Sequence, residues 1–182
     1  MLAEVMEAVG LALAPLGEEE VELVHRAMAG SLARTESALG LMARMAGDHD
    51  DARGHLVRAL HLATLVDDVG AERKAMRRLG VLALHAGNLD RAYDLCSTAA
   101  EQPAKEVLDA LPSLVLAGIT ARLLGRQVDA EQWITRASKV LAEAPGKGAS
   151  ALDRVGQSLL AVDRPDIAIE LFDEAVECAL LG

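Results

Sequence analysis

Residues 79–92 read LGVLALHAGNLDRA, and this pattern organises most of the chain. An apolar run containing Gly80 ends at Gly87, Asn88 follows, and Ala92 lies near the start of the next run. Glycine readily adopts the left-handed conformation that ends a helix, and Asn favours the position that caps the next helix. The segment therefore predicts two helices joined by a tight turn. Gly80, inside the first helix, predicts a close approach by another segment.

The same pattern occurs four times in a fixed register. In each copy a Gly precedes an Ala by twelve residues, and a second Ala follows seven residues later. The first Ala of each copy lies at position 52, 92, 130 or 168, and the residue between the two Ala is apolar or Cys. These three residues fall at spacings of four and three, so they share one stripe of a helix. The stripe can pack closely against the small Gly, and each copy is predicted to be a helical hairpin.

The composition agrees with a helical chain. Of the 182 residues, 34 are Ala and 30 are Leu, both strong helix formers, whereas aromatic residues make up 2%. Residues typical of strands are scarce. The formal net charge is -10, which argues against a nucleic-acid partner because contacts to phosphate backbones need clustered positive charge. We therefore expect an acidic, all-α protein.

The sequence contains no pattern typical of a membrane or secreted protein. Glu4 and Glu7 stand where a secretory signal would carry basic residues. The longest uncharged run, 110–121, has twelve residues, whereas a membrane span needs about 20. Cys96 and Cys178 form neither a metal nor a redox spacing. We expect a cytoplasmic protein with no membrane partner.

The four copies resemble the tetratricopeptide repeat family. The first Gly matches that family's first small position, the turn Gly matches its turn glycine, and the two Ala match its alanines. The matching residues are Gly40, Gly80, Gly118 and Gly156; Gly47, Gly87 and Gly125; Ala52, Ala92, Ala130 and Ala168; and Ala59, Ala99, Ala137 and Ala175. In the fourth copy Asp163 replaces the turn glycine and departs from the pattern. Phe172 matches the family's aromatic residue, but its early Trp and Tyr are absent.

The resemblance implies a right-handed superhelical stack of antiparallel helix hairpins, an α-solenoid. We expect repeats at about 33–66, 73–106, 111–144 and 149–182, with residues 1–32 forming a degenerate N-terminal hairpin that caps the array. The period of 38 to 40 residues exceeds the family's usual value of about 34, which predicts hairpins lengthened by an added turn of the second helix. Similar arrays with such periods occur in sensor regions of bacterial regulators.

A positive stripe is predicted along the first helices of the hairpins. Together these helices carry a net charge of +6, and the rest of the chain carries -16. The resemblance implies that first helices line a concave binding surface, which would suit an acidic, partly apolar peptide or helix. A solvated charged face without a ligand is the alternative. The predicted groove residues are Arg34, Leu41, Arg44, Lys74, Arg77, Arg78, Val81, His85, Ile119, Arg122 and Arg154.

No catalytic, cofactor or metal site is predicted. His49, His55 and His61 are six residues apart, so successive side chains rotate by about 240° and do not converge. The Gly146-Lys147 pair does not form a phosphate loop because Leu141 replaces the required first Gly. Cys96 lies at a core position and has no neighbouring base in the sequence.

Three classes of function are open to a protein with these patterns. The first is a non-catalytic protein–protein interaction module, an adaptor or small chaperone-like protein. The second is a ligand- or peptide-sensing regulatory domain of a larger or multi-component bacterial regulator. The third, an enzyme, would need a converging His, acid and nucleophile, and none is found. The last predicted helix is apolar on two sides, so we expect either a homodimer through Ile169, Val176 and Leu180 or a longer chain that covers them.

Overall fold

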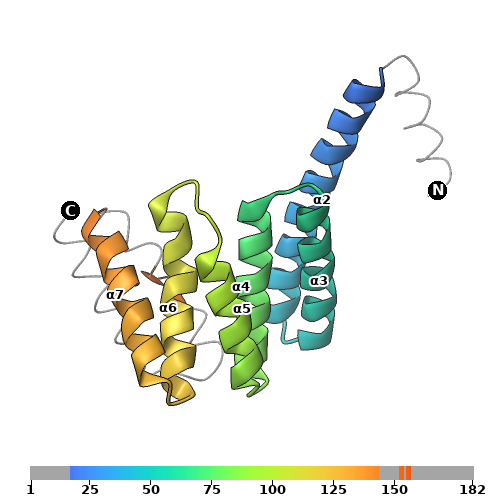
Figure 1. Cartoon of the computed structure of the whole chain (residues 1–182). Coiled ribbons are helices and arrows are strands. Elements are labelled where there is room, and N and C mark those ends of the chain that lie inside the picture. The colour runs from blue at the N-terminus through green and yellow to red at the C-terminus, as the bar shows by residue number, and fades with distance from the viewer. Residues whose placement is uncertain (1–16, 144–151, 154, 157–182) are drawn as a thin grey trace.

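The computed structural model describes residues 17–143, 152–153 and 155–156 (Figure 1). Within this part the chain forms six helices, and each packs against its neighbours in the sequence. The helices are α2 (Glu18–Met45), α3 (His49–Leu65), α4 (Val69–His85), α5 (Leu89–Glu101), α6 (Val107–Leu123) and α7 (Gln127–Glu143). Helix α4 also contacts both α2 and α6. The predicted all-α class and the sequential antiparallel packing are confirmed.

The three turn glycines adopt the predicted left-handed conformation. Gly47, Gly87 and Gly125 have φ values of 84°, 73° and 73°. In each turn the N–H of the following residue donates to an Ala carbonyl five positions earlier, for example Asn88 to Ala83 at 2.9 Å. This bond satisfies one of the carbonyls that a helix end leaves without a partner. Local spacing was therefore sufficient to locate these helix ends.

Short polar side chains begin the next helices. Asp48, Asp68 and Asn88 each accept a hydrogen bond from the backbone N–H three residues later, at 3.0, 3.0 and 3.2 Å. The turn between α3 and α4 has no glycine, and Asp67 takes the left-handed conformation there with φ of 56°. Aspartate tolerates this conformation better than most residues. The acidic pair 67–68 is thus a turn and a helix cap.

The Gly of each described repeat lies directly against the second helix of its hairpin. A Cβ added to Gly40 would lie 2.7 Å from Cγ of Leu56, and one added to Gly80 would lie 2.5 Å from Sγ of Cys96. At Gly118 the nearest atom would be Cγ1 of Ile134, at 3.1 Å. The Ala stripe beside these contacts is 0–5% exposed and comprises Ala52, Ala59, Ala92, Ala99, Ala130 and Ala137. The predicted close contact is confirmed in all three hairpins.

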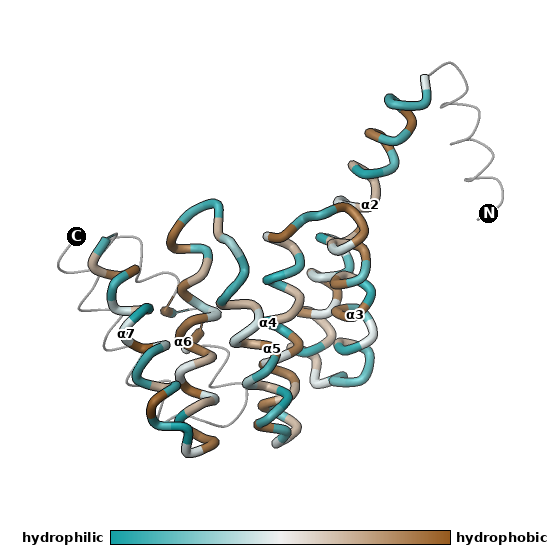
Figure 2. Tube along the Cα trace, in the orientation of Figure 1, coloured by the Kyte–Doolittle hydropathy of each residue, from teal (hydrophilic) through white to brown (hydrophobic). Residues whose placement is uncertain are grey.

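Helix α6 contributes more residues than any other described helix to the larger of the two core clusters, and apolar, brown positions recur along it in Figure 2. Its residues 111–118 are all buried, because α5, α7 and α4 contact it from different sides. A smaller cluster joins α3 to α4 through Ala52, Leu56, Leu79 and Leu82. None of the described helices combines the length and apolar character needed to cross a bilayer.

The first helix differs from the expected boundary at residue 32. Helix α2 runs without interruption for 28 residues, and its N-terminal half extends away from the packed helices (Figure 1). The segment between Gly30 and Arg34 contains neither a proline nor a capping turn, so nothing local ends the helix there. The first part of the predicted cap, residues 1–16, and most of the fourth predicted repeat lie outside the described residues.

The other helix bounds place extra length in the first helices of the hairpins, where the sequence did not predict it. Helices α4 and α6 begin at Val69 and Val107, four residues before the predicted starts, which adds one turn to each first helix. Helices α3 and α7 also have 17 residues, whereas α5 has 13. Pro103 follows α5 and places Gln102 in an extended conformation, which ends that helix early.

Candidate cationic surface

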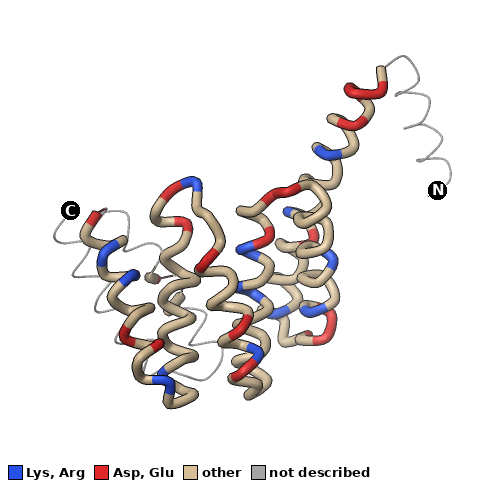
Figure 3. The backbone as a smooth tube through the Cα atoms, viewed as in Figure 1, with Lys and Arg blue, Asp and Glu red and all other residues tan. Residues whose placement is uncertain are grey.

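Helix α4 carries the strongest concentration of positive charge in the described chain (Figure 3). It has four basic residues, Arg73, Lys74, Arg77 and Arg78, and one acidic residue, Glu72. These basic residues lie on adjacent turns of the helix, where positions three and four apart share a face. They belong to two separate environments, one facing α2 and one facing α6.

Arg78 faces α2. Its Nη1 donates hydrogen bonds to the backbone oxygen and to Oγ of Ser37, which is buried. Burial and the nearby positive charge of Arg44 lower the pKa of the Arg78 guanidinium. Arg78 therefore helps to hold α4 against α2, a packing role that the sequence did not indicate.

Arg44 completes the α2 side of this environment. Burial lowers the pKa of its guanidinium, and its Nη1 is buried without a hydrogen-bond partner. Two like charges from different helices are thus brought together, with Ser37 as the acceptor for one of them. An unpaired charge out of water is unfavourable, and an anion placed between the two guanidinium groups would relieve it.

Arg73, Lys74 and Arg77 face α6 across a cavity of about 120 Å³. The other residues that line the cavity are Gly70, Leu108, Asp109 and Pro112. Arg73 is only 4% exposed, and its Nη1 is buried without a hydrogen-bond partner. Arg73 belongs to the basic run of α4 but was not among the predicted groove residues. Its burial depends on α6, which starts one turn earlier than expected.

The remaining predicted groove residues are dispersed. Arg34 is exposed and lies 3.8 Å from a carboxylate oxygen of Asp68, and His85 is exposed with its ring centroid 4.1 Å from that of His49. Val81 is 4% exposed and belongs to the large core cluster, where it has a packing role.

The other predicted groove residues differ in exposure. Lys74 and Arg122 are exposed, whereas Leu41, Arg77 and Ile119 are half-buried. The predicted site residues outside the described part are Arg154, Ile169, Val176 and Leu180.

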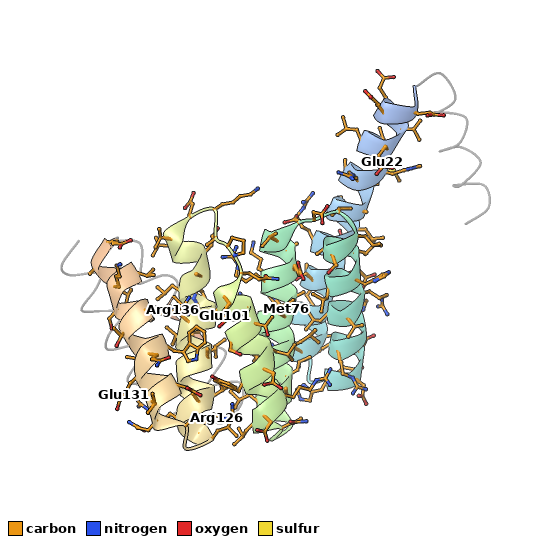
Figure 4. All side chains as sticks on the ribbon, viewed as in Figure 1. Glu22, Met76, Glu101, Arg126, Glu131 and Arg136 are labelled. Carbon is orange, nitrogen blue, oxygen red and sulfur yellow. The ribbon has the colours of Figure 1, made fainter. Side chains whose placement is uncertain are left out.

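A polar network that the sequence analysis did not anticipate joins α5 to α7. The Oη of Tyr93 donates to Oδ2 of Asp129 at 3.2 Å, and Nε1 of Trp133 donates to that Oη at 3.4 Å. The guanidinium groups of Arg126 and Arg136 each lie 4.6 Å from the centre of an aromatic ring, Tyr93 and Trp133 respectively (Figure 4). The two aromatic residues are 40 positions apart, whereas their copies of the repeat are offset by 38, so the repeat pattern did not indicate this contact.

The described residues contain no group of three or more His, Cys, Asp or Glu side chains that could hold a metal ion. Cys96 is buried, and burial raises the pKa of its thiol to about 12, although Arg77 acts in the opposite direction. A thiol with this pKa is almost fully protonated at neutral pH and therefore a poor nucleophile. No protein-family model and no curated protein matches this chain.

Proposed function

We propose that this chain is a tetratricopeptide-like helical repeat protein that binds an acidic, partly apolar segment of a partner protein along α2, α4 and α6. The Gly and Ala contacts recur in three successive hairpins, and the first helices of neighbouring hairpins touch. Both features are typical of stacked repeats. A stack of this kind exposes an extended surface, on which the first helices would form one continuous face.

The observation that carries the proposal is the meeting of Arg44 and Arg78. Two partly desolvated guanidinium groups from different helices repel one another, and one buried Nη1 has no acceptor. A carboxylate from a bound segment would supply that acceptor and compensate both charges. Half-buried Leu41 on the same helix as Arg44 offers an apolar contact. Charge would then steer the encounter, and apolar contacts would extend the lifetime of the complex.

The test measures binding of a fluorescent amphipathic peptide built from Glu and Leu, beside the same peptide with Gln in place of Glu. Arg44→Glu combined with Arg122→Glu should weaken binding of the Glu peptide about tenfold, which corresponds to ~1.4 kcal/mol for two reversed charges. The matched control reverses Arg91 and Lys139, which are exposed on α5 and α7. Equal affinity of both double variants, or equal binding of the two peptides, would contradict the proposal.

The variants avoid Arg78 for a structural reason. Its hydrogen bonds to Ser37 connect α2 to α4, so reversing its charge would disturb folding and binding together. Arg122 is exposed and Arg44 makes no hydrogen bond through its buried Nη1, which makes them the cleaner choice. Helicity measured by circular dichroism should stay unchanged in both double variants.

A further inference from the structure

We propose that the cavity between the first turns of α4 and α6 is a binding pocket for a phosphate group, built on Arg73. The pocket is independent of the surface at Arg44 and Arg78. It would therefore stand if no acidic segment bound there.

The buried guanidinium of Arg73 is the main observation. Arg73 is 4% exposed, its Nη1 is buried without a hydrogen-bond partner, and the side chain lines the cavity. A charge withdrawn from water without a partner is strongly unfavourable, so buried arginines are normally paired. Asp109 lines the same cavity, yet the described part of the chain contains no ion pair between it and Arg73. A ligand oxyanion would supply the missing acceptor.

The surroundings of Arg73 also favour an anion. Lys74 and Arg77 line the cavity, and the first turns of α4 and α6 contribute Gly70, Leu108 and Asp109. Glu106, which precedes α6, makes no side-chain capping hydrogen bond, so the positive end of that helix dipole lies beside the cavity without a cap. Backbone N–H groups at a helix start are suited to binding phosphate.

Charge and size select the kind of oxyanion. The side chains lining the cavity carry three positive formal charges and one negative charge. A phosphate monoester carries a charge of about -1.5 to -2 at neutral pH and three strong acceptor oxygens, so it can accept from Arg73 and Lys74 together more fully than a single carboxylate can. The cavity of about 120 Å³ is several times larger than the ~10–15 Å³ that one water molecule needs, so it has room for one phosphate group. The planar fork of Arg73 can donate two parallel hydrogen bonds to it.

The phosphate could be free or carried by a phosphorylated side chain. Thermal unfolding of the full chain in inorganic phosphate, compared with sodium chloride of equal ionic strength, tests the pocket itself. At a phosphate concentration ten times Kd, the melting temperature should rise by about 3–5 °C. Calorimetric titration with inorganic phosphate and with a phosphoserine peptide separates the two sources. Tighter binding of the peptide would assign the pocket to phosphorylated side chains, and tighter or equal binding of the free ion would assign it to free phosphate.

The deciding variant is Arg73→Met, which keeps an extended apolar side chain but removes the charge. It should abolish the phosphate-dependent rise while Arg91→Met, at an exposed position on α5, retains it. Lys74→Gln provides a second variant at an exposed residue that cannot disturb the core, and it should weaken phosphate binding about fivefold. The proposal is overturned if neither phosphate ligand binds the wild-type protein, or if Arg73→Met and Lys74→Gln bind phosphate as tightly as wild type.

Discussion

Replacing Gly40 with Ala should destabilise the protein, although alanine is the better helix former. A Cβ at this position would lie 2.7 Å from Cγ and 2.9 Å from Cδ2 of Leu56, and 3.1 Å from the carbonyl oxygen of Ala52. Cγ is the branch point of a fully buried side chain, and the carbonyl belongs to the backbone of α3, so neither can move away freely. Overpacking a core costs typically about 1–3 kcal/mol, and helix propensity returns at most about 1 kcal/mol. We therefore expect a net loss of up to about 2 kcal/mol.

Gly54→Ala is the matched control within the same hairpin. Gly54 lies inside α3, and the nearest atom to an added Cβ is Nη1 of Arg58 at an ordinary 3.6 Å. Here only the propensity gain remains, so this variant should be about 1 kcal/mol more stable than wild type. The two Gly→Ala substitutions are thus predicted to change the free energy of unfolding in opposite directions.

Urea unfolding followed by circular dichroism at 222 nm, a standard helical band, measures both variants. A double variant, Gly40→Ala with Leu56→Ala, adds a test of cause. The new methyl group would occupy part of the space that Leu56 leaves, so the double variant should lose less than the sum of the two single losses. If Gly40→Ala were as stable as Gly54→Ala, the close approach would have no energetic role and the reasoning would be refuted.

Two further predictions concern ionisable groups. Burial raises the pKa of Glu36, but hydrogen bonds from His55 and Arg58 outweigh it and hold the pKa below its usual 4.5. The charged carboxylate therefore stabilises the fold above pH 4.5, and this contribution is lost as the pH falls through the lowered pKa. Glu36→Gln should be less stable than wild type at pH 7. Unfolding curves measured at acid pH should show no difference in stability between the two proteins. The pKa of the Cys96 thiol is raised to about 12 by burial, against the effect of Arg77. In a Cys178→Ser background Cys96 should react with a thiol reagent only as fast as the protein unfolds, and rapid labelling of the native protein would contradict its burial.

Features that depend on local spacing could be predicted from the sequence. Gly87 and Asn88 ended one helix and capped the next as expected, because helix ends are determined by a few adjacent residues. The contact between Gly80 and Cys96 followed from the register of the repeat. Both are properties of one hairpin taken alone.

Features that depend on neighbouring hairpins could not be predicted in the same way. Val81 was expected among the groove residues, yet it lies in a core cluster that includes residues of α6. Arg73 and Arg78 lie at the two ends of the same basic run, but one is buried beside α6 and the other donates to Ser37 on α2. A sequence shows which residues share a helix face, whereas packing between hairpins decides which of those faces is covered. The sequence therefore indicated the basic stripe, but it did not indicate that the stripe divides into two environments.

The continuity of α2 has a mechanical consequence. An α-helix rises by about 1.5 Å per residue, so the 28 residues form a rod of about 42 Å. Its C-terminal half packs against α3 and α4, and its N-terminal half extends beyond them (Figure 1). About 18 Å separate Gly30 from Glu18 along this axis, so a tilt of about 10° at Gly30 would displace Glu18 by about 3 Å. A small adjustment where Arg78 meets Ser37 would thereby be amplified into a displacement that a distance probe at Glu18 can detect.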